Sequence, residues 1–142
     1  MEEVLLSVIV PVYNTARDLP GCLDSLLRQS RGDIEFICVD DGSTDDGPAI
    51  LAEYAKRDTR IRVITQENRG FAGARNRGMA EAKGRYIGFC DSDDWVEPAM
   101  YDRLLETAIA GDYPDIVQCS FVSEYVSCGV SLPKIPDILP VC

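Results

Sequence analysis

The chain alternates short runs of apolar residues with longer segments in which apolar residues recur every three or four positions. The first run, residues 5–12, is nearly continuous and rich in β-branched side chains, which is typical of a strand buried on both faces of a sheet. This alternation predicts an α/β fold, with a mostly parallel sheet and helices on both faces. The predicted strands are 5–12, 34–39, 61–65, 85–90 and 116–122, and the predicted helices are 18–29, 45–57, 74–82 and a fourth that opens at Pro98.

The 142 residues provide for one domain with a single core, since 46% of them are hydrophobic. We expect this domain to span residues 5–122. After Val122 the periodicity is lost, and three prolines fall within residues 123–142. This last segment is expected to be an irregular tail or the truncated start of a second half of the protein.

Composition excludes several classes of function. The net charge of −10 argues against nucleic acid as a partner, because nucleic-acid binding depends on Lys and Arg that neutralise phosphates. Cys22, Cys38 and Cys90 fall inside apolar patterns and are expected to be free thiols in the core. The absence of histidine and of any C-x-x-C pair argues against zinc sites and against Ser-His or Cys-His nucleophiles. The sequence shows no membrane helix or targeting segment, so it predicts a cytoplasmic protein. For the intact protein, this prediction includes a location at the inner face of the membrane.

Polar residues follow each predicted strand at the point where it ends. Ligands of open parallel sheets bind beyond the carboxyl ends of the strands, so these segments are the candidate site. In chain order they are Pro11-Val12-Tyr13-Asn14, Asp40-Asp41-Gly42-Ser43, Glu67-Asn68-Arg69-Gly70 and Asp91-Ser92-Asp93-Asp94. Asn14 is a candidate N-cap for the helix that follows it. Ser43 or Thr44 is the candidate N-cap for the next helix.

The last of these segments has the residues of a divalent-cation site. Asp91 and Asp93 are two positions apart, which places both carboxylates on one side of an extended stretch. Carboxylate oxygens suit Mg²⁺ or Mn²⁺, which complete their coordination with water and substrate phosphate. The alternative is that residues 91–94 form an acidic turn that caps the next helix.

Two acidic turns at one sheet edge repel each other unless a cation or hydrogen-bond donors lie between them, which favours a functional role for Asp41 beside residues 91–94. A basic segment offers a complementary surface for an anionic ligand, because arginine can donate two hydrogen bonds to phosphate oxygens. The alternative is a solvated helix face. The basic residues are Arg69, Arg75, Arg77, Lys83 and Arg85.

Four motifs in this order and spacing resemble those of the family 2 glycosyltransferases. They are Ser7 to Asn14, Asp40 to Asp45, Ala74-Arg75-Asn76-Arg77-Gly78, and Gly84 to Asp94. The resemblance covers residues 5–122. It implies an A-type glycosyltransferase fold, the Rossmann-like half that binds a nucleotide-diphospho-sugar, often a UDP-sugar, and an inverting transfer of the sugar.

The resemblance also implies roles for individual residues. Pro11 and Tyr13 border the base, with Tyr13 stacked on it, and Asp41 accepts a hydrogen bond from the base edge. The alternative for Tyr13 is a core aromatic at the end of a strand. Asp91 lies near the ribose and Arg75 near the diphosphate or sugar. The implied donor-binding residues are Pro11, Val12, Tyr13, Asn14, Asp41, Arg75 and Asp91, and the implied ligands of Mn²⁺ or Mg²⁺ are Asp93 and Asp91.

The implied reaction is displacement at the anomeric carbon by a hydroxyl of a saccharide or lipid-linked acceptor. It requires a carboxylate base, which in the family lies beyond the metal motif. Glu124 and Asp137 are the only acids after Asp115 and match no motif, so no base is assigned and it is expected beyond Cys142. The chain is therefore expected to bind donor with little transfer, and to self-associate through apolar surface. The alternative is a fragment that only binds nucleotide.

Two other α/β classes fit the sequence less well. A phospho-acceptor receiver domain needs an acidic pair after its first strand, where this chain has Tyr13 and Asn14. A dinucleotide-dependent oxidoreductase needs a G-x-G-x-x-G turn at the same place, and none is present.

Overall fold

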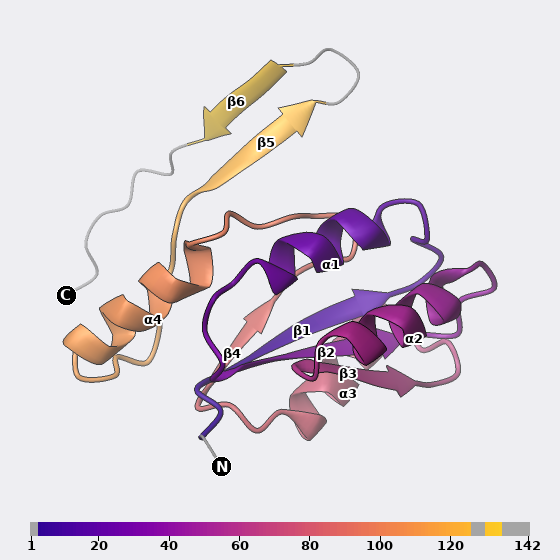
Figure 1. The fold of residues 1–142 in the computed structure, drawn as a ribbon, viewed down its shortest axis with the longest axis horizontal. Coiled ribbons are helices and arrows are strands. Elements are labelled where there is room, and N and C mark those ends of the chain that lie inside the picture. The colour runs from indigo at the N-terminus through magenta and orange to yellow at the C-terminus, as the bar shows by residue number, and fades with distance from the viewer. Residues whose placement is uncertain (1–2, 126–129, 135–142) are drawn as a thin grey trace. The chain divides into compact units, whose positions relative to one another are not determined.

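The structure is a computed structural model that describes residues 3–125 and 130–134 (Figure 1). It divides into two compact units, one up to Asp102 and one from Arg103 onward. The elements in chain order are β1 (Leu6–Val12), α1 (Leu19–Leu27), β2 (Ile34–Asp40), α2 (Gly47–Arg57), β3 (Ile61–Thr65), α3 (Gly70–Glu81), β4 (Tyr86–Phe89), α4 (Met100–Ala110), β5 (Phe121–Tyr125) and β6 (Val130–Lys134).

The first unit is built on a four-stranded parallel sheet in the order β3-β2-β1-β4. Every residue of β1 and of β2 is buried, as their nearly continuous apolar runs predict. β1 pairs with β2 from Leu6↔Ile34 to Val12↔Asp40, and with β4 from Leu6↔Tyr86 to Ile9↔Phe89. The carboxyl ends of these strands therefore meet at one edge of the sheet.

Helices cover both faces of the sheet, as the alternation of elements predicts. α1 and α2 join β1 to β2 and β2 to β3, so right-handed crossovers place both on one face, where they contact each other. The connection from β3 to β4 runs back across the sheet and places α3 on the other face, against β1 and β2 (Figure 1).

α3 approaches the sheet closely because small residues face it. Ala74 is buried in a cluster with Ile37 and Val39. A Cβ on Gly78 would lie 2.5 Å from Cγ2 of Ile9, so only glycine permits this approach. α3 begins at Gly70, four residues before the predicted start at residue 74. Gly70 has φ +77°, a conformation that glycine adopts readily.

The capping predictions are wrong for Asn14, Ser43 and Thr44. None of them caps a helix: α1 begins after Asp18 and α2 after Asp46, and neither helix has a side-chain cap hydrogen bond from its N-cap residue. The N–H of Gly47 instead donates to Oδ1 of Asp45 over 2.9 Å.

The predicted fifth strand of the parallel sheet, residues 116–122, is also wrong. Residues 116–120 form no strand, and β5 begins at Phe121 and pairs antiparallel with β6. Within the predicted irregular tail, residues 123–125 belong to β5 and residues 130–134 form β6, while residues 126–129 and 135–142 lie outside the described part. A partner strand that is close in sequence costs less chain entropy to bring together than a crossover to the parallel sheet.

The cysteine prediction is confirmed within the described residues, where Cys22, Cys38 and Cys90 are buried and free. Burial raises the pKa of the Cys38 thiol to about 12, so this thiol stays protonated at neutral pH. Among the helices that the structure describes, none has the length and apolar character needed to cross a bilayer.

Candidate functional site

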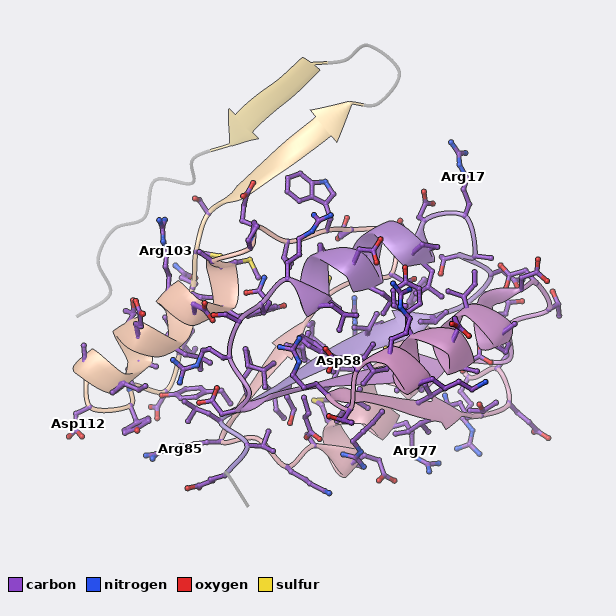
Figure 2. The ribbon with its side chains drawn as sticks, in the orientation of Figure 1. Arg17, Asp58, Arg77, Arg85, Arg103 and Asp112 are labelled. Carbon is purple, nitrogen blue, oxygen red and sulfur yellow. The ribbon has the colours of Figure 1, made fainter. Side chains whose placement is uncertain are left out.

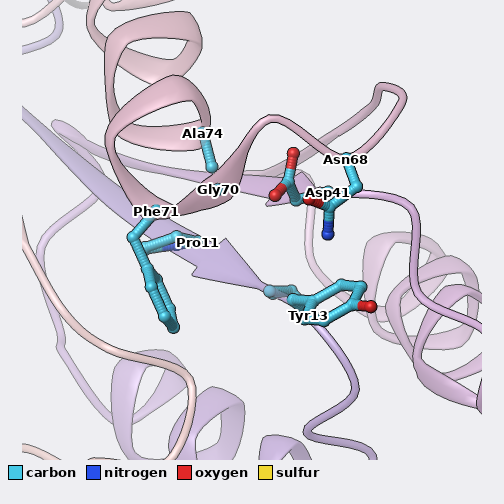
Figure 3. Close-up of a pocket in the computed structure, with 8 residues that line it drawn as sticks. Pro11, Tyr13, Asp41, Asn68, Gly70, Phe71 and Ala74 are labelled. Atoms are coloured by element: carbon cyan, nitrogen blue, oxygen red, sulfur yellow. The ribbon is translucent and has the colours of Figure 1, made fainter.

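The carboxyl ends of β1 and β2 and the start of α3 enclose a cavity of about 230 Å³. Figure 3 shows its walls converging from the end of β1, the turn after β2 and the first turns of α3. This is the edge at which parallel sheets bind ligands. The lining residues are Pro11, Val12, Tyr13, Asp41, Asn68, Gly70, Phe71 and Ala74.

Two aromatic side chains line this cavity. Tyr13 is 42% exposed and Phe71 is 62% exposed, so neither is a core aromatic. Exposed aromatic faces beside a cavity suit a planar ring system, on which they stack. Phe71 is not among the residues that the sequence predicts for the site, although it directly follows the polar segment after the third strand.

Asp41 is held rigidly at the cavity. Its side chain is almost fully buried, and its Oδ1 accepts hydrogen bonds from Nε2 of Gln66 and from the backbone N–H of Arg69, both over 2.8 Å. The carboxylate therefore has donors of its own, and the expected repulsion between the two acidic turns does not by itself require a cation at Asp41. Asp40 has a different role, since its Oδ1 accepts from the N–H of Ser43 within the turn.

Asn14 joins the loop after β1 to the loop after β2. Its backbone has φ 50°, its N–H donates to Oγ of Ser43 over 3.1 Å, and its Oδ1 accepts from the N–H of Thr44 over 2.7 Å. Asn14 is not among the residues that line the cavity. Its observed contacts shape the rim instead.

The acidic loop, residues 91–94, brings three carboxylates together. One oxygen each from Asp91, Asp93 and Asp94 lies within 4.8 Å of the others. The sequence predicts Asp91 and Asp93 as metal ligands and places Asp94 in the same candidate segment without a ligand role. Because the next helix, α4, begins only at Met100, the acidic loop does not cap it, and the capping alternative is wrong.

The carboxylates of the acidic loop interact unfavourably. Burial, followed by the charges of Asp93 and Asp91, raises the pKa of Asp94 above its ordinary value. Three hard oxygen donors at this spacing suit Mg²⁺ or Mn²⁺, which would relieve the repulsion. The residues present therefore fit the cation that the sequence predicts.

Partly buried contacts anchor the acidic loop to the rest of the first unit. Oγ1 of Thr15 and Oγ of Ser92 share a hydrogen bond of 2.7 Å, and the Cys22 thiol donates to the carbonyl of Asp91. The N–H of Cys90 donates to the carbonyl of Ile9 over 3.0 Å. These contacts fix the loop's backbone, and the sequence analysis assigned no such role to Thr15, Ser92 or Cys22.

Arg75 connects the cavity to the acidic loop. It follows Ala74, which lines the cavity, and its Nη2 donates to Oδ1 of Asp91 over 2.9 Å. Its guanidinium carbon lies 5.9 Å from the centre of the Phe89 ring. Its Nε is buried and has no hydrogen-bond partner in the part of the chain that the structure describes.

The basic segment does not form one surface, contrary to the sequence analysis. Arg77 pairs with Glu81 along α3, with 3.4 Å between Nη2 and Oε1. The backbone of Lys83 and of Arg85 lies at the start of the sheet, where their N–H groups donate to Glu35 and to the carbonyl of Val4. Figure 2 shows Arg77 and Arg85 at separate places on the surface. Arg75 is the member of this segment whose side chain contacts the acidic loop.

The chain matches the family described as Glycosyl transferase family 2 over residues 7–133. It is 45% identical over 132 residues to EpsH of Bacillus subtilis, a match that covers 93% of this chain and 38% of EpsH. The chain spans 35% of EpsJ, a second B. subtilis protein that it matches.

Solved structures share the fold of this chain. Residues 1–349 of TarS from S. aureus, in complex with UDP-GlcNAc, match with a TM-score of 0.71 and 29% identity, over 75% of this chain and 31% of that TarS chain. The mannosyltransferase PcManGT of Pyrobaculum calidifontis, in complex with GDP-Man and Mn²⁺, matches with a TM-score of 0.67 and 28% identity, over 72% of this chain and 32% of its own. The expected A-type glycosyltransferase fold is confirmed.

Proposed function

Because this chain belongs to glycosyl transferase family 2, we propose that it binds a UDP-sugar at the carboxyl edge of its parallel sheet. The observation that carries the proposal is the junction at the start of α3. There Ala74 lines the aromatic cavity and the next residue, Arg75, contacts the acidic loop. One ligand with a flat base at one end and a diphosphate at the other would engage both.

The cavity supplies what recognition of a uracil base requires. Tyr13 and Phe71 offer exposed faces for stacking. Asp41 offers a carboxylate acceptor, held in place by Gln66 and Arg69, for the ring N–H of uracil. The TarS complex with UDP-GlcNAc supports a uridine nucleotide, although the GDP-Man complex of PcManGT shows that a relative with this fold takes a guanine nucleotide.

The acidic loop supplies what the diphosphate requires. Asp93 and Asp91 would hold Mn²⁺ or Mg²⁺, with Asp94 close by. A bound divalent cation neutralises the charge that develops on a departing diphosphate. Without a cation, the carboxylates repel the phosphates of the donor, so donor binding is expected to depend on the metal.

The proposed reaction is an inverting transfer. A hydroxyl of a saccharide or lipid-linked acceptor attacks the anomeric carbon, a new C–O bond forms, and the bond to the diphosphate oxygen breaks. The acceptor's proton passes to a carboxylate base, to which we assign no residue.

Nucleotide titration tests this proposal. Trp95 is about half exposed, lies two residues after Asp93 and reports binding by its fluorescence. We expect UDP to bind in Mn²⁺ and to bind much more weakly in excess chelator. Asp93→Asn should remove most of the enhancement by Mn²⁺, whereas Glu53→Gln, a change at an exposed carboxylate of α2, should preserve it. Equal affinity in chelator and in Mn²⁺ would refute the metal-dependent site.

A further inference from the structure

The acidic loop already has a positively charged partner in this structure. The Arg75 guanidinium pairs with Asp91, with 2.9 Å between Nη2 and Oδ1. The pair is partly exposed, at 41% for the arginine side chain and 44% for the aspartate. An exposed ion pair of this kind contributes little to the stability of the fold. It can therefore be broken at low cost.

The guanidinium also has unused hydrogen-bonding capacity. Its Nη2 bonds to Asp91, while its Nε is buried and has no partner in the described part of the chain. The Phe89 ring lies 5.9 Å away and holds the guanidinium from the side through a cation–π contact. Once the guanidinium moves away from Asp91, this N–H can donate to a phosphate oxygen.

Asp91 therefore has two competing cationic partners. A divalent cation shared by Asp91 and Asp93 needs the oxygen that Arg75 now contacts or its neighbour on the same carboxylate. A guanidinium a few ångströms from such an ion is repelled by it. The acidic loop would therefore bind the metal more weakly while Arg75 is paired with Asp91, and would bind Arg75 more weakly while the metal is present.

We propose that Arg75 is the built-in counterion of the acidic loop and exchanges with the metal. In the absence of a divalent cation it holds Asp91. When the cation binds, the guanidinium leaves Asp91 and its N–H groups become available to the donor's diphosphate. This inference rests on the proposed metal-dependent function, and it makes the arrival of the metal the event that presents Arg75 to the donor.

Metal binding without nucleotide tests the exchange. Titration of Mn²⁺, followed by electron paramagnetic resonance at low salt, compares the wild type with Arg75→Gln and Arg77→Gln. The matched control removes the same charge from the same helix, at a residue paired with Glu81 instead of the acidic loop. We expect Arg75→Gln to bind Mn²⁺ about fivefold more tightly than the Arg77→Gln control, because a competitor is removed. Arg75→Lys retains a charge and should stay close to the wild type.

The opposite result has a distinct meaning. If Arg75→Gln binds Mn²⁺ as well as the control does or more weakly, Arg75 only positions Asp91 and the exchange is refuted, while the proposed metal site stands. If neither the wild type nor any variant binds Mn²⁺ saturably, and Asp93→Asn behaves like the wild type, the metal site itself fails together with the exchange.

A measurement on the wild type covers the case in which Arg75→Gln does not fold. The Nε–H resonance of Arg75, assigned by its loss in Arg75→Lys, should shift when Mg²⁺ is added without nucleotide, whereas the Arg77 resonance should not. An Arg75 resonance whose chemical shift does not change at saturating Mg²⁺ would refute the exchange.

Discussion

Tyr13 and Phe71 show how single side chains define the ligand that the cavity can take. Both expose large apolar faces to solvent, and this exposure costs free energy. A flat ring that covers them removes this cost. Asp41 adds direction, because its carboxylate is fixed by two donors before any ligand arrives. In the proposed complex, stacking would supply affinity and the carboxylate would select bases that carry a ring N–H.

Removal of either ring should weaken nucleotide binding. We expect Tyr13→Ala and Phe71→Ala each to reduce the affinity for UDP about tenfold or more, since stacking on an aromatic side chain is worth about 1–3 kcal/mol per base. Uridine should lose affinity to the same degree, because the lost contact is to the base. Met79→Ala, a change at a partly exposed apolar residue of α3 outside the cavity, is the control for isothermal titration calorimetry. Unchanged affinity together with a lower melting temperature would assign these rings to packing.

At the scale of elements, the contact of α3 with β1 positions both Ala74 and Arg75. Gly78→Ala places a methyl group 2.5 Å from Cγ2 of Ile9, where the packing is too tight to accept it. Alanine favours a helix by at most about 1 kcal/mol over glycine, while overpacking costs about 1–3 kcal/mol. We therefore expect Gly78→Ala to destabilise the protein in urea unfolding. Gly21→Ala in α1 meets no atom within 4 Å and should leave stability unchanged or raise it. Equal effects of the two substitutions would contradict this packing.

Glu35 joins the starts of the strands, at the edge opposite the site. Its carboxylate accepts from Oγ of Ser7 over 2.6 Å, from the N–H of Lys83 over 2.9 Å and from Nη1 of Arg62 over 2.9 Å. Burial acts to raise the pKa of Glu35, but these hydrogen bonds outweigh it and leave the pKa below its ordinary value. A Cβ on Gly84 would lie 2.5 Å from the backbone nitrogen of Ser7, so this junction also needs glycine.

The lowered pKa of Glu35 makes stability depend on acidic pH. A group whose pKa is depressed by folding adds stability above its unfolded pKa, near 4.5, and loses it as pH falls through the folded value. Glu35→Gln should cost about 1.5–3 kcal/mol at pH 7, because hydrogen bonds to a charged acceptor are lost. Urea unfolding from pH 7 to pH 3 should show the difference between variant and wild type shrinking below pH 4.5. A difference that is constant with pH would mean that Glu35 contributes no charge-dependent stability.

At the scale of the whole molecule, the sequence predicts the first unit well and the second unit poorly. β1 and β2 are fully buried, so their apolar runs are nearly uninterrupted and their bounds follow from the sequence to within a residue. The start of α3 was missed because Gly70 and Gly73 lower helix propensity, and the favourable packing of Ala74 is tertiary. The run at 116–122 has the composition of a buried strand, but composition does not choose its partner strand.

The sequence likewise predicts some features of the candidate site and not others. Asp41, Asp91 and Asp93 follow strands directly, so parallel topology alone brings them to one edge. The contact of Thr15 with Ser92 joins residues 77 positions apart, and the pairing of Arg75 with Asp91 depends on where α3 crosses the sheet. Neither contact has a local signal, because each is decided by packing.

A ligand that binds this edge should stabilise the parallel sheet as a whole. If UDP with Mn²⁺ binds as proposed, it binds the folded site and not the unfolded chain. At a hundred times its dissociation constant it would then add about 2.7 kcal/mol, or about a hundredfold, to the folding equilibrium. Every residue of β1 and β2 is buried, so we expect their amides to exchange only through global unfolding of this unit. Hydrogen exchange followed by mass spectrometry should therefore show their exchange slowed about a hundredfold by UDP and Mn²⁺. Asp93→Asn should lose most of this effect, because the ligand is then held without its cation. Slowing confined to the loops around the cavity, with β1 and β2 unchanged, would show that the ligand binds without stabilising the sheet.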